Sequence, residues 1–106
     1  MLRQILLRFA QKKERKLFLA AEDGHVELVR TLLEAGVNPN ASSEGGFTAL
    51  MWAAARGHID VVQALLGSGA ESETRTRNGK TARDIAVQEG QHNVVALLGK
   101  AGDQAV

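Results

Sequence analysis

The chain has 106 residues, of which 44% are hydrophobic and 24% are charged, and its formal net charge is +1. This length suffices for one domain, and the composition is that of folded proteins, unlike that of disordered or collagen-like chains. The absence of cysteine excludes disulfides, thiolate metal ligands and cysteine nucleophiles. No stretch has the run of about 18 apolar residues that is typical of a membrane-spanning helix.

The first 16 residues are strongly basic. Six of them are lysine or arginine and Glu14 is the one acid, so the remaining 90 residues carry a net charge of −4. An apolar stripe at helical spacing contains Leu2, Ile5, Leu6 and Phe9. We predict an amphipathic helix over residues 1–14 that caps the units that follow. Three other interpretations stay open: a partner-binding arm, a mitochondrial presequence, and an electrostatic tether to nucleic acid or an anionic membrane.

The rest of the chain repeats itself at an interval of 33 residues. Two glycine series keep this interval, namely Gly24, Gly57 and Gly90, and Gly36, Gly69 and Gly102. Apolar positions keep it too, as in Ala20, Ala53 and Ala86. A fixed period of this length indicates a repeat architecture. We predict one repeat domain over residues 15–106, with copies at approximately 15–44, 45–77 and 78–106.

The middle copy predicts two short helices. Thr48 is a favourable N-cap, helix-forming residues follow it, and Gly57 ends that helix. A second apolar stripe begins at Ile59 and stops before Gly69. Helices this short are marginal alone, so neighbouring copies must stack. The expected fold is an all-α solenoid of stacked antiparallel helix pairs, joined by hairpin-like loops, with an extra helix at the N-terminus.

Three strings, GHVELVRTLLEAG, GFTALMWAAARGHIDVVQALLGSGA and NGKTARDIAVQEG, resemble consecutive ankyrin repeats. The likeness covers about residues 15–102. Ala49 and Ala82 stand where the family usually has proline, and Met51 and Asp84 stand where it usually has histidine. The resemblance implies an ankyrin-repeat solenoid that serves as a protein–protein interaction module or adaptor.

Other chemistry finds little support in the sequence. His25 and His58 share one register of the repeat, and stacked helices lie roughly 8–10 Å apart, which favours polar links between loops over a shared zinc ion. No serine has a histidine and a carboxylate placed to activate it. We interpret Asn40 as a turn residue that bonds its own backbone. We predict no enzymatic activity, no metal and no cofactor.

The resemblance implies that partners dock on the concave side, which is formed by the loop tips and by the first helix of each pair. The matching positions are Glu22, Asp23, Ser42, Glu44, Phe47, Trp52, Ala55, Arg56, Arg75, Arg77, Asn78, Lys80 and Gln88. Acidic residues lie toward the N-terminal end of this row and basic residues toward the C-terminal end. We hypothesise a partner segment whose acidic cluster meets the second loop tip and whose apolar anchor lies near Phe47. In the alternative interpretation, Arg75, Arg77 and Lys80 only balance the charges of Glu71 and Glu73 in a solvated loop.

Trp52 has two interpretations that can coexist: a semi-buried packing residue, and a contact in the binding groove. We expect a monomer that binds another protein and no small-molecule substrate, and we disfavour nucleic acid and membrane as partners. We expect an intracellular, cytoplasmic location, with the nucleus and the mitochondrion as open alternatives.

Overall fold

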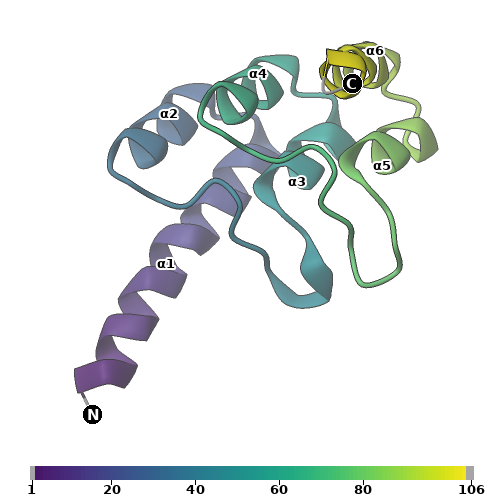
Figure 1. Cartoon of the computed structure of the whole chain (residues 1–106). Coiled ribbons are helices and arrows are strands. Elements are labelled where there is room, and N and C mark those ends of the chain that lie inside the picture. The colour runs from purple at the N-terminus through teal and green to yellow at the C-terminus, as the bar shows by residue number, and fades with distance from the viewer. Residues whose placement is uncertain (1, 105–106) are drawn as a thin grey trace.

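The computed structural model describes the backbone of residues 2–104 and the side chains of residues 2–4 and 12–99. Its elements are α1 (Leu2–Asp23), α2 (Val26–Glu34), η1 (Glu44–Gly46), α3 (Ala49–Arg56), α4 (Ile59–Gly67), α5 (Ala82–Gln88) and α6 (His92–Gln104). In Figure 1, α1, α3 and α5 form one layer, and α2, α4 and α6 form a second layer above it in this view. The predicted all-α solenoid of stacked helix pairs is confirmed.

The first helix of the middle pair is α3, which begins and ends where the sequence indicates. The Thr48 hydroxyl accepts a hydrogen bond from the Met51 backbone N–H at 3.4 Å, and the Thr48 backbone N–H donates to Met51 Sδ at 3.4 Å. At the other end Gly57 has a φ of 75°, a left-handed conformation that glycine adopts without steric cost. Met51 therefore supplies a weak acceptor where the family usually has histidine.

The next pair begins with a stronger version of the same cap. The Thr81 backbone N–H donates to Asp84 Oδ2 at 3.0 Å, and the Asp84 backbone N–H donates to the Thr81 hydroxyl at 3.2 Å. The bond from the Thr81 backbone, followed by the bond with its side chain, holds the pKa of Asp84 below its usual value of 3.8. Asp84 therefore keeps the cap with a carboxylate in place of histidine.

This pKa shift predicts a pH-dependent contribution to stability. Because the pKa of Asp84 is lowered by folding, its contribution is present above about pH 4 and is lost as the pH falls through the folded-state value. We expect Asp84→Asn to lower the free energy of unfolding at pH 7, measured by urea denaturation. The difference from the original chain should shrink at pH 3. A difference that is equal at both pH values would contradict this role.

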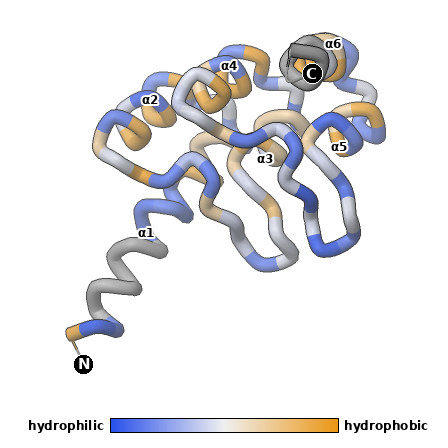
Figure 2. Tube along the Cα trace, viewed as in Figure 1, coloured by the Kyte–Doolittle hydropathy of each residue, from blue (hydrophilic) through white to orange (hydrophobic). Residues whose placement is uncertain are grey.

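Alanines at one register of the repeat let α1, α3 and α5 approach each other closely. Ala20 is 2% exposed, and Ala53 and Ala86 are fully buried. Leu50 and Leu65 fill the space between the two layers, and both are buried. Figure 2 shows apolar stretches on the helices of both layers and a hydrophilic loop between α4 and α5. None of the described helices is long and apolar enough to cross a membrane.

The extra helix expected at the N-terminus is the first part of α1. It continues without a break into the part of α1 that packs against α3, and Figure 1 shows it projecting away from the helix pairs. Leu2 is 72% exposed. The side chains of Ile5, Leu6 and Phe9 lie outside the described residues. Capping of the first repeat by this stripe therefore stays a prediction, and no helix end marks the expected boundary at residue 14.

Large apolar side chains are exposed where the described part of the solenoid offers no further helix pair. Leu28 on α2 is 45% exposed, whereas Val61, one repeat later, is fully buried. At the opposite end Val87 on α5 is 59% exposed, and Ala54, one repeat earlier, is fully buried. Leu28 and Val87 are therefore apolar residues of the kind that is buried where one repeat packs against the next.

Candidate functional site

Two hairpin-like loops project from the same side of the stack, before α3 and before α5 (Figure 1). In the first loop, the Ser43 backbone N–H donates to the Phe47 carbonyl at 2.8 Å. In the second, the Thr76 backbone N–H donates to the Lys80 carbonyl, also at 2.8 Å. The two bonds are one repeat apart, so both loops close in the same way.

The tips of these loops are joined to each other through their backbones. The Arg77 N–H donates to the Gly45 carbonyl at 2.8 Å. Gly46 has a φ of +81°, and a Cβ added there would lie 3.3 Å from both Thr76 Cα and Arg77 N. Glycine is therefore required by the backbone conformation and by the close approach of the second loop. The backbones of the two tips are therefore held side by side.

At each interface between consecutive helix pairs, the side chain just before the second helix of the later pair reaches a backbone carbonyl of the earlier pair. His58 Nε2 lies 2.9 Å from the Glu22 carbonyl oxygen, and Gln91 Nε2 lies 3.1 Å from the Ala55 carbonyl oxygen. These bonds satisfy carbonyl groups near the ends of α1 and α3. The predicted structural role is confirmed for His58. His25 is exposed, and the equivalent role of Gln91, 33 residues after His58, was missed.

The equivalence of the two links can be tested by exchange. We expect His58→Ala to lower the free energy of unfolding by about 1 to 3 kcal/mol, since the Glu22 carbonyl loses its donor. His58→Gln should lose less than half as much, because glutamine makes the same link at the next interface. Chemical denaturation measures both values. A glutamine variant as unstable as the alanine variant would show that ring packing matters more than the hydrogen bond.

Asn40 does not act as predicted. Its amide donates to the Gly69 carbonyl at 3.0 Å, and its Oδ1 accepts from the Glu71 backbone N–H at 2.7 Å. The turn around it is instead closed by Asn38, whose Oδ1 accepts from the Asn40 backbone N–H. The interpretation of Asn40 as a residue bonding its own backbone was therefore wrong, because the stacked loop after α4 offers it two better partners.

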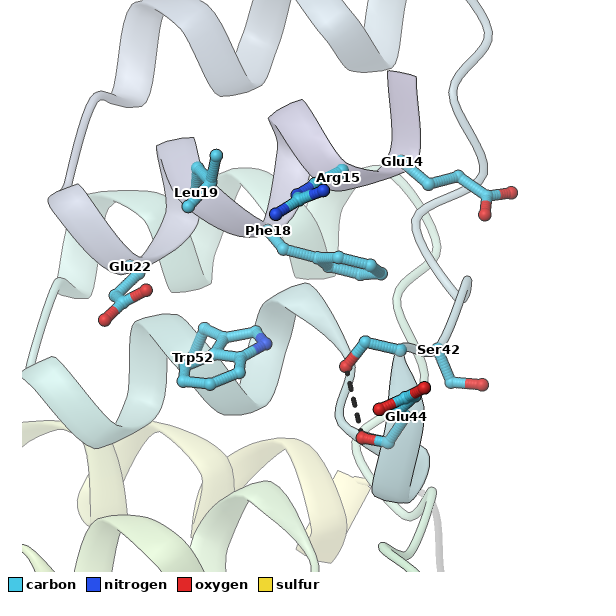
Figure 3. A pocket seen from close by; sticks show the side chains of 9 residues that line it. Glu14, Arg15, Phe18, Leu19, Glu22, Ser42, Glu44 and Trp52 are labelled. Carbon is cyan, nitrogen blue, oxygen red and sulfur yellow. Dashed lines mark hydrogen bonds between the residues drawn. The ribbon is translucent and has the colours of Figure 1, made fainter. Parts of the chain in front are cut away.

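A hollow of about 790 Å³ lies between α1, α3 and the first loop. Figure 3 shows the rings of Phe18 and Trp52 in it, with Glu22 beside Trp52 and Glu44 on the loop opposite. The hollow is lined by Glu14, Arg15, Phe18, Leu19, Glu22, Ser42, Ser43, Glu44 and Trp52. It therefore combines an apolar floor with a surplus of carboxylates.

Trp52 is the semi-buried packing residue that was predicted, and its contact with a partner stays a prediction. It is half-buried, and its ring lies 5.4 Å from that of Phe47, at an interplanar angle of 34°. It also lines the hollow. Its indole Nε1 is buried and has no hydrogen-bond partner among the described residues. A buried donor without an acceptor costs about 1–3 kcal/mol, so the site retains a polar group for which an acceptor is missing.

A second hollow follows the first along the concave side, between α3 and α5. Trp52 lines both, and here it is joined by Ala55, Arg56 and Gln91. The Arg56 guanidinium donates to Glu22 at 3.1 Å across the two repeats. The side chain of Arg56 is 62% exposed, so this pair is worth at most about 1 kcal/mol. A partner can displace it at small cost.

The predicted contact residues divide into two groups. Six of them line the two hollows, namely Glu22, Ser42, Glu44, Trp52, Ala55 and Arg56. The other seven lie outside these hollows, namely Asp23, Phe47, Arg75, Arg77, Asn78, Lys80 and Gln88. Sequence analysis missed five residues of the first hollow, namely Glu14, Arg15, Phe18, Leu19 and Ser43. Glu14 belongs to the segment that was treated as a separate cap. Arg15, Phe18 and Leu19 lie in the predicted first copy, where only Glu22 and Asp23 were selected.

The cations of the second loop are not equivalent. Arg75 Nη1 donates to the Gly79 carbonyl at 2.8 Å and is tied to its own loop. Arg77 and Lys80 are exposed. Within the described residues, no ion pair joins these cations to Glu71 or Glu73. If Glu71 and Glu73 offset the positive charges of this loop, they therefore do so without forming direct ion pairs in the described part of the chain.

Comparison with protein families identifies the repeat. A family model described as ankyrin repeats, in three copies, matches residues 17–105. A search of curated proteins gave no match. Among the side chains that the structure describes, no group of three histidine, aspartate or glutamate residues is arranged to hold a metal ion.

Proposed function

Because the chain belongs to the ankyrin-repeat family, we propose that it binds a segment of a partner protein along its concave side and catalyses no reaction. Ankyrin repeats are in general protein–protein interaction modules. The observation that carries the proposal is the pair of hollows that meet at Trp52. A half-buried tryptophan between two hollows is a suitable anchoring point, since tryptophan is enriched among residues that dominate binding energy.

Charge supports a defined orientation of the partner. Arg77 and Lys80 are exposed, lie at one end of the concave side and make no direct ion pair within the described part of the chain. Arginine and lysine make charge-assisted hydrogen bonds with carboxylates, and arginine does so through two parallel bonds. An acidic cluster in the partner fits this end. Phe47 and Trp52, in contact with each other, supply apolar surface next to it.

Reversal of this charge tests the proposal. We expect the double variant Arg77→Glu and Lys80→Glu to slow association with a partner captured by affinity purification, because electrostatic attraction chiefly raises association rates. The dependence of the association rate on salt concentration should become weaker. Surface plasmon resonance over a range of salt concentrations measures both.

A matched control separates this effect from general charge. Arg77→Glu alone is compared with Arg30→Glu, which introduces the same charge change on the exposed side of α2, in the other layer. Only the change at Arg77 should reduce the association rate. Equal effects of the two variants would move the interface away from the second loop.

A second function is favoured by the projecting first part of α1. Arg3, Lys12 and Lys13 of α1 are exposed, and Figure 1 shows the first part of this helix projecting away from the stacked pairs. Clustered lysine and arginine attract anionic surfaces, and the attraction falls with salt. In this function α1 is an electrostatic tether to nucleic acid or an anionic membrane, and the concave side keeps its own partner.

The tether is tested by neutralising these residues. If α1 is a tether, the variant Arg3→Gln, Lys12→Gln and Lys13→Gln should lose most of its salt-sensitive adsorption to phosphatidylserine vesicles and to duplex DNA. Binding of the captured partner protein should be unchanged. Absence of adsorption by the original chain at low salt, or adsorption equal to that of the variant, would exclude the tether.

A further inference from the structure

The hollow between α1 and α3 has the opposite charge to the second loop. Glu44 on its rim is exposed, and Glu14 is half-buried. Glu22 is shared with Arg56 across the edge of the hollow. Arg15 is the one cation that lines it. Carboxylates thus outnumber cations around the hollow, whereas the tip of the second loop presents the exposed cations Arg77 and Lys80.

Its floor is apolar and open. Leu19 is 52% exposed, and the rings of Phe18 and Trp52 face the same space (Figure 3). Lysine and arginine side chains lay their methylene groups on apolar surface while the charged end reaches out to polar partners. Aromatic rings add attraction for a cation above their faces. An aromatic and aliphatic floor with carboxylates at the rim therefore suits a long cationic side chain.

We propose that this hollow receives a lysine or arginine side chain of the bound partner segment. The inference rests on the proposed function and adds a second requirement to it: the partner carries a basic residue as well as an acidic cluster. The basic residue lies over α1 and α3, and the acidic cluster lies at the second loop.

The two contact points define a spacing. They are about one repeat apart, and helices packed side by side are separated by roughly 8–10 Å. An extended chain advances about 3.3 Å per residue, so about three residues separate the basic residue from the start of the acidic cluster. A partner with these charges in immediate contact, or far apart, does not satisfy both points.

Synthetic peptides test the inference with the intact chain. The first probe is a blocked peptide with one arginine next to a leucine, a spacer of about three serines and a run of aspartates. The second has glutamine in place of the arginine. Trp52 is the single tryptophan of the chain, so its fluorescence reports binding at the hollow. We expect the arginine peptide to bind about two- to fivefold more tightly, the range measured for partly exposed charge pairs.

Variants of the chain give opposite signs. Glu44→Gln should weaken binding of the arginine peptide by about two- to fivefold, and Arg15→Gln should strengthen it, since Arg15 repels a second cation. Glu34→Gln, an exposed glutamate on α2, is the matched control and should have no effect. The Glu44 and Arg15 variants should each change the affinity for the glutamine peptide less than they change the affinity for the arginine peptide.

The outcomes separate this inference from the proposed function. Equal affinity of the two peptides, with binding that still depends on Arg77, would overturn the basic-residue requirement and leave the acidic docking intact. Equal losses in the Glu44 and Glu34 variants would also overturn it. If neither peptide changes the fluorescence of Trp52 or shows binding by calorimetry, both proposals are wrong.

Discussion

Small side chains at one register of three successive helices set the distance between the repeats, and this distance governs the rest of the structure. Ala20, Ala53 and Ala86 are buried where α1, α3 and α5 meet. A bulkier residue at any of them would push two neighbouring repeats apart and create strain or voids, since interiors are close-packed. At the distance the alanines allow, His58 and Gln91 reach carbonyl groups of the preceding repeat. The same distance lets the loop tips bond to each other.

The stack also determines how charge is distributed over the concave side. Each repeat contributes one loop tip and one helix face, so neighbouring repeats can carry opposite charges without burying any of them. The first hollow has a surplus of carboxylates, and the second loop presents Arg77 and Lys80. Glu22 and Arg56, which lie between these regions, pair with each other. In the proposed complex, the partner segment contacts these local charges in order and one aromatic site at Trp52.

Features with a 33-residue period could be predicted from the sequence, and features without it could not. Thr48, Gly57 and the apolar stripe from Ile59 fix helix ends and faces through local rules, and the structure confirms them. Asn40 was misread because its partners, Gly69 and Glu71, come close only after stacking. Gln91 was missed because a different residue type makes the same bond as His58. The hollow beside α1 was only partly predicted, because the apolar residues of its floor, Phe18 and Leu19, carry no sequence signal that separates them from core positions.

The backbone bond between Arg77 and Gly45 has a consequence for recognition. Flexible loops lose conformational entropy when they bind, and this loss reduces affinity. Here folding itself has already immobilised the two tips as one ridge, with Gly46 fitted against its neighbour. Side chains along the ridge can therefore be exchanged without changing its shape. Such a surface can acquire a new specificity through substitution alone, because the scaffold does not have to be rebuilt each time.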